Sequence, residues 1–476
     1  MPSLGVDCFR PRKTDLKEGT LLVNGNAPVR KVVVTGRGAG VTNQSGTRLL
    51  GRIAERVGIA AGLSDVMAGT VTRPTGHDRG RLLTQVAMML AAGGRCLADL
   101  KTLRNQPGLF GTVASDPTAW RAMHQVDDDA LAAMVAVRQH AIRRLLEFSG
   151  VERIVLDVDA TLVDVDSEDK QHACATFKGG FGFAPMVCMI EPLGLPAGML
   201  RPGNATANNA GDQLAVIDEA IGALPADWQA GHAPGDDASL VRRPLLVRAD
   251  TAAGTKKMLT GLAARNVVFS VGMRTSDEAV TGIQAIHETT WHGAVDADGK
   301  PRDGAQVTEA KHLVPSWAPP GTRAIVRRER PHPGASLRLW DYNGWRHQVV
   351  LTNDDDSDIA ALEALHRGHA QVENRIKNLK DTGLARLPFA NYDANRAWFE
   401  LVLLAALLLV ALQQLVDDDE LRVAEPRRLR YALLHVAAKI VAHARRTWLH
   451  LDAAWPWTPQ LLAAHRRLPL LTAKLA

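Results

Sequence analysis

The chain has 476 residues, of which 46% are hydrophobic, so it is longer than one typical domain and can bury a sizeable core in two or three structural units. Its net charge of +5 is modest, so the placement of charge matters more than the total. The four cysteines (Cys8, Cys96, Cys174 and Cys188) have no Cys-x-x-Cys spacing, which argues against a zinc site or a disulfide framework and fits a reducing cytoplasm.

Residues 1–30 show little hydrophobic periodicity, and we expect a flexible arm there. Residues 31–150 follow a mainly helical pattern. The predicted helices lie near 44–66, 80–97, 118–124 and 128–148. We expect Asp116 and the run from Asp127 to Asp129 to act as helix caps, because aspartate accepts hydrogen bonds from free backbone N–H groups.

Two apolar runs in residues 151–274 each stop at a carboxylate. Ile-Val-Leu-Asp-Val-Asp-Ala-Thr (154–161) contains Asp159, and Pro-Leu-Leu-Val-Arg-Ala-Asp-Thr (244–251) contains Asp250. Runs of this kind predict buried strands of parallel type, whose carboxyl ends are where open α/β sheets place their chemistry. We therefore predict an α/β core with both carboxylates at strand ends.

Residues 275–348 look like a β-rich insertion that the core does not require. β-type runs at 322–329 and 346–352 flank Asn343-Gly344, a strong hairpin signal, so we expect a small β-meander. Its tryptophans are Trp291, Trp317, Trp340 and Trp345. Most tryptophans of a small sheet form its core, although one of them could stack on an unpaired base.

Residues 349–415 are expected to complete the core with a helix that carries Glu373. At helical spacing His366, Ala370, Glu373, Lys377 and Lys380 lie near one face, so this helix could present a carboxylate and then a basic stripe to a DNA backbone. An exposed surface helix with a Glu373–Lys377 pair is the alternative. We favour surface positions for His366 and His369.

The apolar run from Leu401 to Leu412 is only 12 residues long, whereas a membrane span needs about 20. We expect a buried core helix that packs behind the Glu373 helix, and no membrane partner.

Positive charge is concentrated in residues 416–476, which we predict to be a basic helical region. From Leu421 onward there are ten Lys and Arg residues against two acidic residues, an excess of eight, whereas the rest of the chain carries −3. Arg427, Arg428 and Arg430, with Arg445 and Arg446 near Trp448, suit contact with phosphates. A solvated face on a helical packing unit is an equally good interpretation.

Three carboxylates suit a site for divalent metal ions. Mg²⁺ and Mn²⁺ bind through oxygen, and two such ions roughly 4 Å apart can clamp the attacking and leaving oxygens of a phosphoryl transfer. Without metals, the carboxylates would repel an anionic substrate. Asp159, Asp250 and Glu373 are therefore more plausible as metal ligands than as direct acids or bases.

The three motifs together resemble the DDE transposases of bacterial insertion sequences, which have an RNase H-like catalytic core. The resemblance runs from about Val151 to about Leu415 and rests on Asp-Ala-Thr (159–161), Arg-Ala-Asp-Thr (248–251) and Glu-Asn-Arg-Ile-Lys-Asn-Leu-Lys (373–380). It implies that Asp159, Asp250 and Glu373 are the catalytic metal ligands for Mg²⁺ or Mn²⁺, with two ions. It also places Lys380 at the position of the family's DNA-contacting lysine.

The resemblance implies further properties. The helical region at 31–150 would bind the terminal inverted repeats, target DNA would be a second partner, and a homodimer would hold two DNA ends in the cytoplasm at the nucleoid. Related transposases often carry Tyr and Arg seven and four residues before the Glu, where this chain has His366 and His369, with Arg367 nearby. Lys377 and Arg367 join Lys380 and the Arg427–Arg430 cluster as predicted DNA contacts.

Two alternatives remain open. Asp157-Val-Asp159-Ala-Thr after an apolar strand also matches the nucleophile motif of haloacid dehalogenase-like phosphatases, where Asp157 would be phosphorylated and Asp159 would act as acid and base. Residues 161–200, however, read as strands and turns, and three successive strands followed by a helix is the RNase H order. A catalytically inactive DNA-binding remnant of a mobile element is the second alternative.

Overall fold

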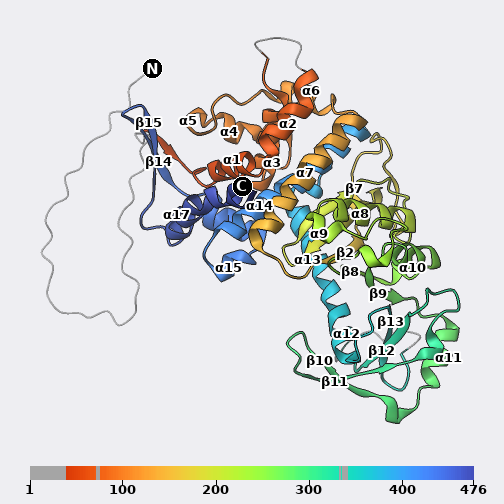
Figure 1. The fold of residues 1–476 in the computed structure, drawn as a ribbon. Helices are drawn as coiled ribbons and strands as arrows, with labels where there is room; N and C mark the ends of the chain where they lie inside the picture. Colours follow the sequence, from red (N-terminus) through yellow and green to blue (C-terminus); the bar gives the residue numbers. More distant parts are fainter. Residues whose placement is uncertain (1–38, 71–75, 332–333, 335–340, 476) are drawn as a thin grey trace, which may run out of the picture. The chain divides into compact units, whose positions relative to one another are not determined.

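The computed structural model describes residues 39–70, 76–331, 334 and 341–475 of the chain, with side chains up to Leu471 (Figure 1). The chain consists of two compact units, Met1–Gly40 and Val41–Ala476. Only Ala39 and Gly40 of the first unit fall within the described residues, so the predicted arm at 1–30 lies outside them. The helices and strands of the described residues all belong to the second unit.

The described residues form a nine-stranded mixed sheet, and its presence among many helices confirms the predicted α/β class. The strand order is β10-β11-β12-β13-β9-β8-β2-β6-β7. Strand β8 pairs in parallel with β2 and β9, and the remaining neighbours pair antiparallel. The strands are β2 (Val155–Ala160), β6 (Met186–Glu191), β7 (Leu195–Met199), β8 (Leu246–Ala249), β9 (Val268–Met273), β10 (His292–Val295), β11 (Pro301–Glu309), β12 (Arg323–Glu329) and β13 (Arg346–Thr352).

The core strands follow the expected succession. Strands β2, β6 and β7 form an antiparallel run, and helix α8 (Ala210–Gly222) comes next, with α9 (Ala226–Gln229) before β8 and α10 (Lys256–Ala263) between β8 and β9. Strand β6 is buried along its whole length, which explains its continuous run of Met, Val, Cys and Ile. A small sheet of β3 (Val163–Asp164), β4 (Cys174–Ala175) and β5 (Phe181–Phe183) follows β2 in the chain.

The predicted meander is present, but it does not form a sheet of its own. Strand β13 pairs with β9, so β10 to β13 continue the core sheet, with α11 (Asp277–Gln284) preceding them. The Asn343-Gly344 turn is also present, because Tyr342 and Trp345 exchange two backbone hydrogen bonds and both central residues have positive φ, 50° and 74°. Trp340 lies outside the described residues.

The region before the sheet is helical, as predicted. Its helices are α1 (Thr47–Arg56), α2 (Ile59–Met67), α3 (Arg79–Ala91), α4 (Lys101–Arg104), α5 (Pro107–Phe110), α6 (Asp116–Met123) and α7 (Asp128–Ser149). Asp127 caps α7 by accepting a hydrogen bond from the N–H of Ala130 (2.8 Å), as expected. Ser115, not Asp116, occupies the N-cap position of α6, and the Asp116 carboxylate pairs with Arg104 instead.

The last part of the core carries the helices that follow β13. They are α12 (Ile359–Arg367), the 3₁₀ turn η7 (Gly368–Ala370), α13 (Gln371–Leu379), the π-turn η8 (Lys380–Leu384) and α14 (Tyr392–Leu415). Among the described residues, α14 is the one helix long and apolar enough to cross a membrane. Within its most apolar stretch, 89% of the residues are buried, and the helix packs against α1, α3, α7, α13 and β7. It is therefore the core helix that the sequence predicted.

The C-terminal region is only partly helical, so the prediction for residues 416–476 was wrong in part. Helices α15 (Asp419–Arg422), α16 (Pro426–Leu429) and α17 (Thr458–Arg467) flank a hairpin of β14 (Ala438–His443) and β15 (Arg446–Leu451). Arg445 lies in the hairpin turn with φ 62°, and Arg446 and Trp448 lie on β15. Ala444 and Arg445 occupy the two positive-φ positions of this turn, where glycine or asparagine is usual. The sequence therefore contains no signal that predicts the turn.

A buried ion pair joins the helical region to the core. The Arg138 side chain on α7 is fully buried and donates to Glu400 on α14 (2.7 Å), to Glu219 on α8 (2.8 Å) and to the Pro196 carbonyl on β7 (2.9 Å). Burial raises the pKa of Glu400, and the Arg138 guanidinium only partly offsets that effect. Arg138 therefore neutralises a carboxylate that the interior would otherwise not tolerate as an ion.

Replacing Arg138 alone should leave Glu400 as a buried charge without a partner. We expect Arg138→Met to lower the free energy of unfolding by about 3–5 kcal/mol, measured by denaturant titration. The double variant Arg138→Met/Glu400→Leu should recover much of that loss, because it removes both fully buried charges and leaves only the partly exposed Glu219, which still accepts a hydrogen bond from the Gly198 N–H. Equal stability of the single and double variants would contradict this account of the ion pair.

Candidate active site

Strand pairing places Asp159 and Asp250 side by side. In the parallel ladder of β2 and β8, Val158 is the partner of Ala249, so the next residues along both strands are Asp159 and Asp250. Asp159 is half-buried, whereas Asp250 is exposed and accepts a hydrogen bond from the N–H of Ala252 (2.9 Å) at the start of the following turn. The two predicted carboxylates thus meet at one end of the sheet.

A buried ion pair lies two residues below these carboxylates. Asp157 is the ladder partner of Arg248, and the Arg248 guanidinium donates to both Asp157 oxygens, at 2.8 and 2.6 Å. Because side chains two residues apart share one face of a strand, the ion pair and the pair of carboxylates lie on the same face of the sheet. The Asp157 side chain is fully buried with both oxygens occupied, which argues against its use as a phosphatase nucleophile.

The helix that carries Glu373 is tied to the same ion pair. The Nδ1–H of His369 in η7 donates to Asp157 (3.0 Å), and Arg248 donates to the Leu365 carbonyl at the end of α12 (2.7 Å). A Cβ at position 368 would lie 2.2 Å from the Arg248 guanidinium, so a side chain there would displace Arg248 from its partners. Burial raises the pKa of Asp157, but the hydrogen bonds from His369 and Arg248 outweigh burial and hold that pKa below its usual value.

A second contact holds α13 against the sheet. Arg375 donates to both carboxylate oxygens of Glu191 on β6, at 2.8 Å each, and the Glu191 side chain is nearly buried. Two residues earlier on the same helix, Glu373 is exposed. Helix α13 contacts β2, so Glu373 is held on the side of the sheet where Asp159 and Asp250 end their strands.

The three predicted carboxylates repel one another. Burial, then the charge of Asp250, and in smaller part the charge of Glu373 raise the pKa of Asp159 to about 6. In the described part of the chain, no Lys, Arg or His forms an ion pair with any of the three, whereas the neighbouring Asp157 and Glu191 are each neutralised by an arginine. Asp159, Asp250 and Glu373 therefore carry charge that no ion pair in the described part of the chain compensates.

This donor set fits a hard divalent cation in its chemistry. Carboxylate oxygens without protein cations are the ligands that Mg²⁺ and Mn²⁺ prefer. Within the residues that the structure describes, however, no three His, Cys, Asp or Glu side chains are already gathered closely enough to hold a metal ion. The charges of Asp250 and Glu373 thus act on Asp159, but the three side chains are not close enough together to coordinate one metal ion.

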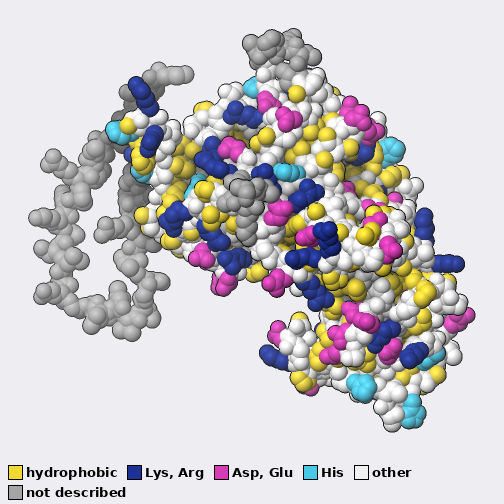
Figure 2. Space-filling view, in the orientation of Figure 1, with side chains coloured by type: hydrophobic (Ala, Val, Ile, Leu, Met, Phe, Trp, Pro, Cys, Tyr) yellow, Lys and Arg dark blue, Asp and Glu magenta, His cyan; other side chains and the backbone are white. Residues whose placement is uncertain are grey.

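A cleft of about 800 Å³ lies along the end of α13 and contains several of the predicted DNA contacts. Lys377, Lys380 and Arg427 line it. Burial lowers the pKa of the Lys380 ammonium, and Asp164 and Asp159 act in the opposite direction, so Lys380 lies within electrostatic reach of the predicted site. Figure 2 shows Lys and Arg side chains gathered over α13 on this face.

The cleft also contains cations that the sequence did not single out. Arg95, from the segment after α3, and Arg386, from the segment after η8, line it with exposed side chains. Neither of them, nor Lys380 or Arg427, has an ion-pair partner among the described residues. Lys377 pairs with Glu425 (2.8 Å), but both side chains are more than half exposed, so this contact is weak.

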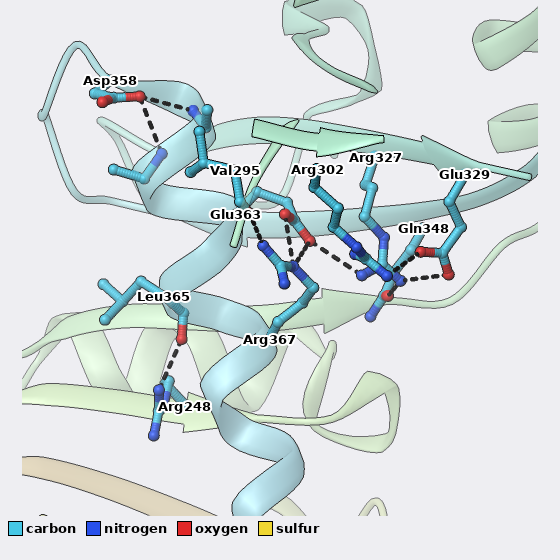
Figure 3. A network of polar contacts seen from close by, with 12 residues as sticks. Arg248, Val295, Arg302, Arg327, Glu329, Gln348, Asp358, Glu363, Leu365 and Arg367 are labelled. Carbon is cyan, nitrogen blue, oxygen red and sulfur yellow. Dashed lines mark hydrogen bonds and ion pairs between the residues drawn. The ribbon is translucent and has the colours of Figure 1, made fainter. Parts of the chain in front are cut away.

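Arg367 does not lie where the DNA-contact prediction requires. Its guanidinium donates to the buried Glu363 (2.9 Å) and to the Val295 carbonyl on β10 (Figure 3). Arg327 on β12 also pairs with Glu363 (3.1 Å), so this network fastens α12 to the meander. We correct the assignment of Arg367 from DNA contact to structural anchor.

Arg430 needs the same correction. Its side chain is nearly buried and donates to the Asp381 carboxylate (2.8 Å) and to the Ala91 carbonyl (2.8 Å). Burial lowers its pKa, and Asp381 opposes that effect. Arg428 is exposed and lies over the Trp457 ring (4.6 Å), outside the residues that line the cleft.

The two histidines are buried, not on the surface as we predicted. His366 lies against the Ser270 hydroxyl on β9 (3.0 Å), and burial followed by the nearby charge of His369 lowers its pKa to about 3. His366 is therefore neutral at physiological pH and does not belong to a basic stripe. The predicted stripe is reduced to the part of the helix from Glu373 to Lys380.

Sequence reasoning missed the network formed by Asp157, Arg248 and His369. The signal was present, because Asp157 precedes Asp159 by two residues and Arg248 precedes Asp250 by the same interval. If the two carboxylates meet at one sheet edge, the residues two positions before them must also face each other.

The family model for the transposase DDE domain group 1 matches residues 26–473 of the chain. This match extends beyond the catalytic core into both the helical region before it and the C-terminal region after it. No curated protein matches the chain at a significant level.

The network predicts the effect of shortening Arg248. We expect Arg248→Lys to lower the thermal unfolding midpoint and to impair DNA cleavage while leaving DNA affinity within about two-fold of the parent, because a lysine cannot bridge Asp157 and Leu365 at once. Differential scanning fluorimetry, cleavage assays and fluorescence anisotropy measure the three effects.

The matched control is Arg242→Lys, since Arg242 is 70% exposed and pairs with Asp227 on the surface. This variant should behave as the parent does. Full cleavage activity in Arg248→Lys would show that the network does not position the carboxylates.

Proposed function

The chain belongs to the transposases with a DDE domain, and from that premise we propose that it acts for a bacterial insertion sequence, cleaving and transferring DNA strands at terminal inverted repeats. One observation carries the proposal. Asp159, Asp250 and Glu373 form no ion pair with a protein cation in the described residues, and the charges of Asp250 and Glu373 act on Asp159. The helix that carries Glu373 continues into a cleft lined by several lysine and arginine side chains without ion-pair partners in that part of the chain. A negative cluster next to a positive cleft suits metal-assisted chemistry on a polyanion.

Asp159, Asp250 and Glu373 would hold the divalent cations, which we propose to be two Mg²⁺ or Mn²⁺ ions. When bound, such ions polarise a phosphodiester and lower the pKa of water or a 3′-hydroxyl that attacks it. The protein contributes position: Asp157, Arg248 and His369 set the spacing of β2, β8 and α13, and Arg375 keeps α13 against β6.

The cations of the cleft would bind the DNA backbone. Lys380, Arg427, Arg95 and Arg386 can each neutralise a phosphate without first breaking an ion pair, and Lys377 can do so after losing its weak contact with Glu425. Arg428 remains a proposed contact at the rim. Duplex DNA, as inverted repeats and as target, is the proposed partner, with recognition of the repeats in the helical region at 31–150.

We further propose that two copies of the chain act together in the cytoplasm at the nucleoid, since joining two element ends requires each end to be held. A DNA-binding remnant without activity is less well supported, because the three carboxylates are all present and uncompensated. The phosphatase alternative lacks support, since its nucleophile would be the buried Asp157.

The first test removes one charge from the carboxylate cluster. Asp159→Asn should reduce Mg²⁺-dependent cleavage by at least about 1000-fold while DNA affinity stays unchanged, because the metal ligands and the cleft are separate surfaces. In metal-free buffer the variant should unfold at a higher temperature than the parent, because the fold disfavours the charged form of Asp159. Added Mg²⁺ should stabilise the parent more than the variant.

Asp157→Asn separates the two neighbouring aspartates. It removes a charge from a buried ion pair, so it should lower the unfolding temperature, in contrast to Asp159→Asn. An Asp159→Asn protein with parental cleavage would overturn the site assignment.

The second test measures the cleft by salt dependence. Lys380→Ala, Arg427→Ala and Arg386→Ala should each reduce the slope of log affinity against log salt by about 0.9, equally on repeat and random duplexes, because each removes one phosphate contact. Arg242→Ala, an exposed arginine outside the cleft, is the control and should leave the slope unchanged. A variant that loses preference for the repeat at an unchanged slope would show that its residue reads sequence.

A further inference from the structure

A hollow open to solvent lies at Thr251 and is separate from the cleft that contains Lys380. Its volume is about 480 Å³. Its walls come from the β4–β5 hairpin, the loop at 203–208, the turn at 251–255 and Arg274. Because Thr251 follows Asp250 directly, a ligand in this cavity would lie next to a proposed metal ligand.

The loop at 203–208 supplies hydrogen-bonding groups that the protein itself does not use. Asn204, Thr206 and Asn208 line the cavity with exposed side chains, and none of these side chains makes a hydrogen bond within the described part of the chain. A carboxamide carries both donors and an acceptor, as does the edge of a nucleobase. These side chains are therefore matched to a planar polar ligand.

An aromatic ring borders the same cavity. Phe177 lies at the tip of the β4–β5 hairpin and is 65% exposed. The hairpin is packed directly on the loop at 203–208, because a Cβ at Gly203 would lie 2.1 Å from the Gly182 carbonyl oxygen. The Thr176 hydroxyl accepts a hydrogen bond from the Gly180 N–H (3.2 Å), which fixes the tip. The ring is thus presented to the cavity by a built support.

A cation completes the lining. Arg274 follows β9, is exposed, and has no ion-pair partner among the residues that the structure describes. Arg274 also borders a neighbouring cavity of about 450 Å³ that is lined by Trp317. A DNA backbone could therefore reach the Arg274 guanidinium from either of the two cavities. A single exposed phenylalanine is common on a protein surface, but an aromatic face, free amides and a free guanidinium together match the face of a base, its polar edge and the adjoining phosphate.

We propose that this cavity binds one unpaired nucleotide of the DNA strand that is processed at Asp250. The base stacks on Phe177, its edge meets Asn204 and Asn208, and Arg274 binds the adjoining phosphate. The inference rests on the proposed function, since it assumes that DNA is the substrate. A paired base cannot stack on Phe177, because its faces are covered by its neighbours, so the cavity selects a nucleotide outside the duplex.

The test uses the full-length protein in metal-free buffer, which prevents cleavage, and measures affinity by fluorescence anisotropy. Three probes share one random duplex: blunt, with a single-stranded 3′ overhang, and with the same overhang built from abasic nucleotides. The parent protein should bind the overhang with bases about five- to one-hundred-fold more tightly than the abasic overhang, the range that stacking of one base supplies.

The variants assign that preference to residues. Phe177→Ala should lose it, and Phe177→Tyr should keep it, because the ring is retained. Arg274→Ala should weaken binding of the normal and abasic overhangs equally, since a phosphate contact ignores the base. Tyr342→Ala is the control, because Tyr342 is an exposed aromatic residue beside the Asn343-Gly344 turn that lines neither this cavity nor the cleft that contains Lys380.

Two outcomes would overturn the proposal: a parent protein that binds the duplex without preferring an overhang with bases, or a Phe177→Ala variant that retains the preference. Failure to bind any of the duplexes would contradict the proposed function itself. The two failures are therefore distinguishable.

Discussion

The buried contact between Asp157 and Arg248 is the constraint on which the candidate site depends. It is a ladder pair in the parallel part of the sheet, so it can form in only one register of β2 and β8. A slip of one residue would turn every side chain to the opposite face and would leave two buried charges without partners. The same slip would separate Asp159 from Asp250. The electrostatic cost of misalignment therefore protects the geometry of a site that, by itself, consists of mutually repelling carboxylates.

The third carboxylate depends on this contact through the helix break between α12 and α13. Arg248 reaches the Leu365 carbonyl, and His369 reaches Asp157, so the break is fastened on both sides. Figure 3 shows the C-terminal half of α12 held to the meander by Glu363 and Arg367. Because β13 pairs with β9, the meander is itself an extension of the core sheet. Glu373 is thus positioned by two neighbouring parts of one continuous sheet.

The sequence predicted the α/β class, the β-meander, the buried helix at 401–412 and the meeting of Asp159 with Asp250, because these features follow from local patterns and from the rule for parallel strand ends. The prediction from sequence failed where the hydrogen-bond and ion-pair partners of a side chain come from distant segments of the chain. His366 and His369 are buried because β9 and β2 supply partners for them, and Arg430 is engaged because Asp381 and Ala91 lie against it. The turn at Ala444 and Arg445 was not predicted for a local reason, because neither residue type is typical of positive φ.

Strand β1 (Val41–Thr42) pairs with β14, close to 400 residues later in the chain, and the Ser45 hydroxyl donates to the Val436 carbonyl (2.7 Å). Helix α1 also packs against α14. During synthesis, the residues around β1 must therefore wait for nearly the whole of the following chain before they find these partners, since a ribosome delivers the chain from its N-terminal end. A nascent chain interrupted before residue 438 would hold all three candidate carboxylates but would lack the strand that closes its helical region. Order of translation thus delays completion of the proposed DNA-end-binding region until after the chemistry-bearing core has been made.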